Sequence, residues 1–207
     1  MKKLIILFSA LLCAAAALAQ TPEEILSRME AAMNAHEKDG IAMVVDVKMP
    51  ILGTMSSKTY AVGEKFRVEV SMAGVDVITW SDGKTKWTYT SKDNEVVIEN
   101  ENPDRPTSSD SDTEMFSGIA EGYDVSLSKE TDKAWYFNCK KSKTNKDKDA
   151  PKSIDIVVAK GTYYPISLSA QLKGVSITMR NVTFGVSDKQ VSFNAKDYPD
   201  VKITDKR

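Results

Sequence analysis

The sequence predicts a mainly β protein, a strongly curved antiparallel sheet or open barrel of about eleven strands with helices on one side. Three observations lead to this fold class. Short segments in which apolar and polar residues alternate recur along the chain. Turns rich in Gly, Pro, Asn and Asp separate these segments. Two further segments carry apolar residues at helical spacing, one before the first strand and one in the middle of the chain.

The chain begins with the three-part pattern of a secretory signal peptide. Residues 1–19 contain two lysines, then an apolar run, then a stretch of small residues. We expect cleavage before Gln20, which leaves residues 20–207 as a single exported domain. Cys13 offers an alternative as a lipid-attachment cysteine, but the bulky Leu12 precedes it where such a site needs a small residue.

A first helix is predicted between Thr21 and Gly40. Thr21 and Glu24 match a capping box, and Pro22 suits the first turn. The apolar stripe of this helix is Ile25, Leu26, Met29 and Met33.

Alternating segments follow the first helix. The clearest is Lys65 to Met72, in which Phe66, Val68 and Val70 share one face and charged residues share the other. The expected strands are 41–49, 55–62, 65–72, 75–80, 85–90, 95–99, 123–128, 134–140, 154–160, 166–173, 175–184 and 190–194.

A second helix is predicted in the middle of the chain. Ser111 to Glu114 matches another capping box, and Met115, Phe116 and Ile119 follow at helical spacing before Gly122 ends the segment.

Composition argues against several classes of function. The chain has 28 basic and 29 acidic side chains, without the basic excess that a nucleic-acid partner requires. Cys139 is the one cysteine left after cleavage, so no internal disulfide can form, and we expect a buried, inert thiol rather than a reactive one. The single histidine, His36, is expected to be exposed and leaves no cluster for zinc. We therefore predict no enzyme, no catalytic residue, no metal and no cofactor.

Two features remain open to more than one interpretation. Methionines on the helices and strands suit a surface for variable apolar ligands, with ordinary core filling as the alternative. A curved sheet of this size encloses more volume than its own side chains readily fill, which favours the ligand surface over ordinary core filling. Six lysines between Lys140 and Lys152 are expected to form a solvated loop, with a docking patch for an anionic membrane or protein as the alternative.

Several segments together resemble the periplasmic outer-membrane lipoprotein carrier family, the LolA-like proteins. These segments are the amino-terminal helix, the hairpin from Trp80 to Tyr89, the helix with Met115 and Phe116, the Tyr163-Tyr164-Pro165 strand entry and the tail from Phe193 to Asp205.

The resemblance implies an incomplete eleven-strand LolA/LolB-like barrel whose concave apolar face is covered by a helical lid. It implies a monomer in the periplasm of a Gram-negative bacterium. Such a carrier receives acylated lipoproteins from an inner-membrane lipoprotein-releasing transporter and delivers them to an outer-membrane acceptor. Alternatives are a periplasmic lipid or lipoprotein sensor, or another protein that binds hydrophobic ligands on the same fold.

The resemblance also places the ligand-binding residues. The lid faces are Ile25, Leu26, Met29 and Met33 on the first helix and Met115, Phe116 and Ile119 on the second. The concave sheet is lined by Met43, Val45, Val47, Phe66, Val68, Val70, Trp87 and Tyr89. Many members carry an Arg-Pro step before the strand that corresponds to Lys65 to Met72, and that arginine latches the lid. Here the position reads Gly63-Glu64, so no latch residue is assigned.

The signal pattern predicts that the exported protein begins at Gln20 and carries no acyl chain. The intact mass of the secreted protein tests this. A mature form that begins at a diacylated Cys13 would contradict both the cleavage site and the soluble carrier.

Overall fold

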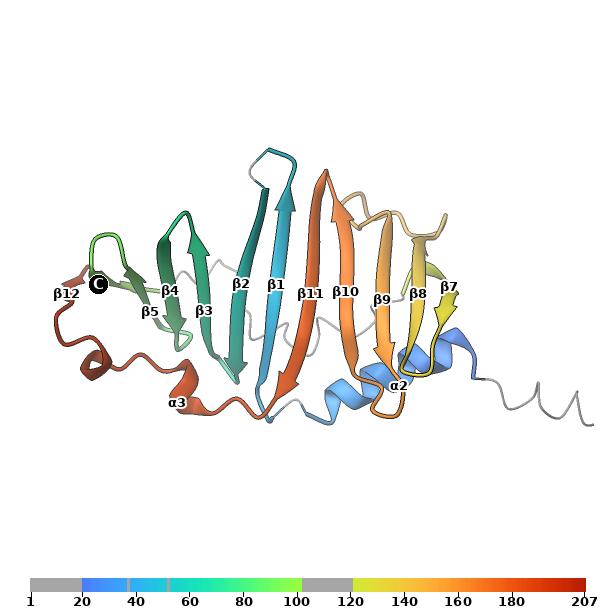
Figure 1. Ribbon diagram of the computed structural model, residues 1–207, viewed down its shortest axis with the longest axis horizontal. Helices are drawn as coiled ribbons and strands as arrows, with labels where there is room; N and C mark the ends of the chain where they lie inside the picture. Colours follow the sequence, from blue (N-terminus) through green and yellow to red (C-terminus); the bar gives the residue numbers. More distant parts are fainter. Residues whose placement is uncertain (1–19, 37, 52, 102–120) are drawn as a thin grey trace, which may run out of the picture.

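The molecule is built on one open sheet of twelve strands (Figure 1). The computed structural model describes residues 20–36, 38–51, 53–101 and 121–207. The strand order is β12-β6-β5-β4-β3-β2-β1-β11-β10-β9-β8-β7. The edge strands β12 and β7 do not pair with each other, so the described sheet does not close into a barrel. The mainly β, open architecture expected from the sequence is thus confirmed.

The strands are β1 (Ile41–Met49), β2 (Gly53–Val62), β3 (Lys65–Met72), β4 (Val75–Ser81), β5 (Thr85–Thr90), β6 (Glu95–Asn100), β7 (Tyr123–Glu130), β8 (Ala134–Lys141), β9 (Ser153–Ala159), β10 (Pro165–Leu172), β11 (Val175–Phe184) and β12 (Lys202–Asp205). The helices are α2 (Pro22–Asn34), α3 (Asp188–Val191) and the 3-10 turn η3 (Ala195–Asp197). The expected signal peptide and the expected helix with Met115, Phe116 and Ile119 lie outside the described residues.

The expected strand at residues 190–194 is wrong. The segment contains the end of α3 and an irregular stretch. The Ser187 amide donates to Gln190 Oε1 over 2.8 Å at the start of this one-turn helix, and Val191 is buried at its end. Alternating apolar residues therefore marked a segment that packs on the sheet rather than one that joins it. The last strand is β12, which runs parallel to β6.

Helix α2 begins at the predicted capping box. The Glu24 amide donates to Thr21 Oγ1 over 3.2 Å, and the Thr21 amide donates to Glu24 Oε2 over 3.1 Å. The predicted apolar stripe is fully buried, with no side chain more than 3% exposed: Ile25, Leu26, Met29 and Met33. Burial of each such side chain contributes roughly 1.5–3 kcal/mol to folding, so the helix is held mainly by this contact.

The sheet has two faces with different coverings. We call the side that contacts α2 the inner face, and the opposite side the outer face. Residues paired across antiparallel strands point to the same side, so register places Phe137, Ile156, Leu168 and Met179 on the inner face with Met43, in the core cluster beneath α2. The outer face of the same strands is polar and carries, for example, an ion pair of 2.7 Å between Asp46 and Arg180.

The tail that follows β11 covers the outer face of the other half of the sheet. In Figure 1 it runs from the foot of β11 past α3 to β12 at the far edge. Phe193 lies 5.4 Å from the ring of Trp80 and 5.8 Å from the ring of Trp87. Tyr198 lies 5.7 Å from Trp80 and 5.1 Å from Tyr89. This aromatic cluster is a second core on the side of the sheet opposite α2.

The second core predicts a stabilising role for the tail. Replacing Phe193 by Ala should lower the free energy of unfolding by about 2 kcal/mol, because its aromatic contacts with Trp80, Trp87 and Tyr198 are lost. Urea unfolding measures this. The control is Ile166→Ala, whose side chain is 45% exposed and should change stability little. Equal effects of the two substitutions would contradict the second core.

Candidate functional site

The inner face continues as an apolar surface beyond the core cluster under α2. In one row across β1 to β4, Val45 pairs with Ser57, Ser57 with Val70, and Val70 with Val77. Val68 occupies the next row, opposite Thr59. These side chains are half-buried, unlike the fully buried residues beneath the helix. The sheet therefore presents branched aliphatic side chains beyond the cluster under α2, interspersed with the hydroxyl side chains of Ser57, Thr59 and Thr79.

Most of the predicted site residues lie on this one face. The residues in or against the core cluster under α2 are Ile25, Leu26, Met29, Met33, Met43, Val45 and Phe66. Val47, Val68 and Val70 share the face through the register of β1, β2 and β3. Met115, Phe116 and Ile119 lie outside the described residues.

The placement of Trp87 and Tyr89 on the concave sheet is wrong. Phe66 pairs with Ser81, and Ser81 pairs with Lys86, so the inner face of β5 is formed by Lys86 and its alternate neighbours. Trp87 pairs with Trp80 instead, on the outer face under the tail. Both aromatic residues belong to the second core.

Alternation in β5 identifies two faces but does not say which one points inward. The polar residues of this strand are Lys86, Thr88 and Thr90, and register places them on the inner side. The informative signal lay in the tail, because the aromatic residues Phe193 and Tyr198 need aromatic or apolar partners.

His36 is half-buried and bonded, not exposed as expected. Its Nδ1 lies 2.7 Å from Asp39 Oδ2, and its Nε2 lies 2.6 Å from the Tyr164 hydroxyl oxygen. Its ring stacks on Phe184 with 4.4 Å between ring centroids. Because His36 follows the end of α2, these contacts attach the carboxyl end of the helix to the sheet.

Tyr163 attaches the start and the middle of α2 to the sheet. Gln20 Nε2 donates to the Tyr163 hydroxyl over 3.0 Å, and an Arg28 guanidinium nitrogen donates to the same oxygen over 3.1 Å. The hydrogen bond from Gln20 makes the largest contribution to lowering the pKa of Tyr163, and the hydrogen bond from Arg28 lowers it further. The Tyr163 ring stacks on Trp135 of β8 at 5.5 Å. The adjacent residues Tyr163 and Tyr164 thus hold α2 on the inner face by polar contacts at two positions.

An open groove of about 290 Å³ lies between α2 and β7 at the edge of the sheet. Leu26, Tyr123 and Val125 supply its apolar wall, and Glu23, Glu30 and Glu121 supply carboxylates. Helix α2 nevertheless contacts this edge strand, because Tyr123 and Val125 pack against the core cluster beneath the helix.

The described residues give little basis for metal or thiol chemistry. Within them, no group of three His, Cys, Asp or Glu side chains is placed to hold a metal ion. Cys139 is completely buried, and this burial, together with the nearby Asp155 carboxylate, raises the pKa of its thiol to about 11. The thiol therefore stays protonated at neutral pH. No helix in the described ranges has the length and apolar character to cross a membrane.

Comparisons with known proteins give matches among solved structures. No protein-family model matches the chain, and no curated protein matches it. The structure of LprF from Mycobacterium bovis aligns with a TM-score of 0.50 and 9% identity, over 80% of this chain and 94% of LprF. The lipoprotein LppX from Mycobacterium tuberculosis aligns with a TM-score of 0.48 and 10% identity, over 81% of this chain and 98% of LppX.

A LolA superfamily protein from Nitrosomonas europaea aligns with a TM-score of 0.36 and 10% identity, over 84% of this chain and 99% of that protein. At these identities a structural likeness speaks for the fold alone. The open twelve-stranded sheet with α2 on one face confirms the expected mainly β, open architecture, and the alignment with LprF shows that the two proteins share a fold.

The attachment of α2 makes a testable prediction. Tyr164→Phe removes the hydroxyl beside His36 and should weaken the docking of α2 by about 1 kcal/mol, the usual net value of one hydrogen bond. Amide hydrogen exchange in residues 22–34 should become faster. Tyr136→Phe is the matched control, because no hydrogen bond to the Tyr136 hydroxyl is found among the described residues. Unchanged exchange in the Tyr164 variant would show that apolar burial alone holds the helix.

Proposed function

We propose that this protein is a periplasmic carrier that binds the acyl chains of lipoproteins on its inner face. It would receive them from an inner-membrane transporter and deliver them to an outer-membrane acceptor. The observation that carries the proposal is the apolar inner face beyond the core cluster under α2, formed by Val45, Val68, Val70 and Val77.

Acyl chains need such a surface to cross water. Each CH₂ group removed from water contributes ~0.8 kcal/mol, so the surface does not need directed polar contacts to bind a long chain. Branched aliphatic side chains suit this ligand because they impose no hydrogen-bond geometry on it. The binding requires no chemical step.

Helix α2 has the properties of a cover for this surface. Its apolar stripe is part of the inner-face core, and its polar attachments at Tyr163 and His36 lie at its margins. Acyl chains can therefore extend the apolar contact of the helix without breaking a hydrogen bond within the sheet.

The proposal predicts that Val68→Glu lowers the affinity for an uncharged phenyl-naphthylamine dye about tenfold or more, because a carboxylate on the inner face must be desolvated when the dye binds. Dye fluorescence measures the affinity, and displacement by a palmitoylated peptide measures competition by an acyl chain.

The control is Val44→Glu. Val44 lies on the outer face, where its strand partners are Lys58 and Arg180, so the same new charge meets basic neighbours and no ligand surface. We expect its dye affinity to match the wild type. Equal dye affinities for the wild type and the folded Val68→Glu and Val44→Glu variants would exclude the inner face as the binding surface.

A further inference from the structure

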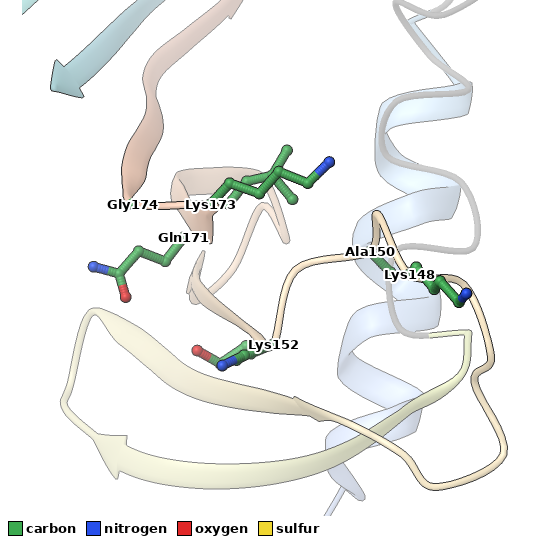
Figure 2. A pocket seen from close by; sticks show the side chains of 8 residues that line it. Lys148, Ala150, Lys152, Gln171, Lys173 and Gly174 are labelled. Atoms are coloured by element: carbon green, nitrogen blue, oxygen red, sulfur yellow. The ribbon is translucent and has the colours of Figure 1, made fainter.

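A cavity lies at the end of the sheet away from α3 and the tail. It has a volume of about 460 Å³ and lies between the loop that joins β8 to β9 and the β10–β11 hairpin. Figure 2 shows Lys173 extending from the hairpin toward the part of the loop that carries Lys148 and Ala150. Lys148, Lys152 and Lys173 all line the cavity, with Ala150 and Leu172 as apolar neighbours.

The cavity has a strong excess of positive charge. Three lysines and no acidic residue line it, and the rest of the loop adds Lys140, Lys141, Lys143 and Lys146 with only Asp147 and Asp149, whereas the whole chain has a net charge of −1. Within the described residues, no ion pair involves Lys148 or Lys152. Lys173 contacts Asp149 at 2.6 Å, but both side chains are more than 70% exposed, so this pair is weak.

The walls of the cavity are held in place before any ligand binds. The Tyr123 hydroxyl of β7 donates to the Pro151 carbonyl over 3.0 Å, and the Lys141 amide donates to the Lys152 carbonyl over 2.9 Å. On the other wall, Lys173 and Gly174 form the tight turn with φ angles of 49° and 86°. A lysine with positive φ is uncommon, and the turn places this one at the tip of the hairpin.

Leu172 brings the inner face to one wall of the cavity, whereas Ser153 and Gln171 reach it from the outer face. Register places Leu168, Ala170 and Leu172 of β10 on that face, opposite Ile156, Ile154 and Val175. Leu168 is buried, whereas Leu172 is half-buried and lines the cavity. An apolar column therefore leads from the core toward the lysines.

We propose that this cavity binds the phosphate of an anionic amphiphile whose acyl chains lie on the inner face. The inference rests on the proposed function, because the inner face must bind the chains. Lysines hold phosphate as mobile point charges, which suits three exposed side chains around one cavity. The apolar column favours a phosphate attached to acyl chains over a free anion. The role of the lysine-rich loop is then selection of the headgroup.

The test compares two lipids with the same chains, dioctanoyl phosphatidylglycerol and dioctanoylglycerol, by displacement of the phenyl-naphthylamine dye from the full chain. We expect the phospholipid to bind about tenfold more tightly, as three charge pairs of modest strength would give. The triple variant Lys148→Gln, Lys152→Gln and Lys173→Gln should bind both lipids equally. Added salt should reduce the preference of the wild type.

The control variant carries Lys84→Gln, Lys133→Gln and Lys189→Gln, three exposed lysines at the opposite end of the sheet with the same change in net charge. It should keep the wild-type preference. If the triple variant at Lys148, Lys152 and Lys173 also prefers the phospholipid, the headgroup site is excluded, but the proposed carrier function is not. If neither lipid displaces the dye, the proposed function itself fails. If glycerol phosphate binds as tightly as the phospholipid, the site is one for soluble anions and the lipid assignment is overturned.

Discussion

This sheet buries apolar side chains on both of its faces, and in the described part of the chain no second sheet packs against it. Helix α2 covers the inner face over one half of the strands, where Met29 and Met33 are fully buried. The tail covers the outer face over the other half, where Phe193 and Tyr198 pack on Trp80. Because the two coverings lie on opposite sides, the sheet is stabilised along its whole width without being closed.

This arrangement determines where a ligand surface can exist. Among the described residues, the outer face is either polar or filled by the aromatic cluster, so the apolar surface for a ligand lies on the inner face. On the inner face, the fully buried cluster ends at the margin of α2, and aliphatic side chains such as Val68 and Val70 continue beyond it. The candidate ligand surface exists because α2 is too short to cover the whole inner face of a twelve-stranded sheet.

The two ends of the strands differ in chemistry. The foot of the sheet carries α3 and the attachment of α2 through Tyr164 and His36. The opposite end carries the β10–β11 hairpin turn and the lysine-rich loop, where Lys173 and Lys152 line one cavity. Antiparallel connections bring these separate lysines together, because the β8–β9 loop and the β10–β11 turn lie at the same end of neighbouring strands. An amphiphile on the inner face would thus meet a hydrophobic core at one end and positive charge at the other.

The sequence by itself determined the local elements. The capping box at Thr21 and the apolar stripe of α2 predicted a helix and its buried side, and strict alternation placed eleven strands within about two residues. These features depend on neighbours along the chain. Tertiary structure alone decided the rest. The register between β4 and β5 places Trp87 on the outer face, and the tail packs on that face and forms a second core there. The partners of His36 and the cavity between Lys152 and Lys173 also depend on contacts between distant segments, which periodicity cannot report.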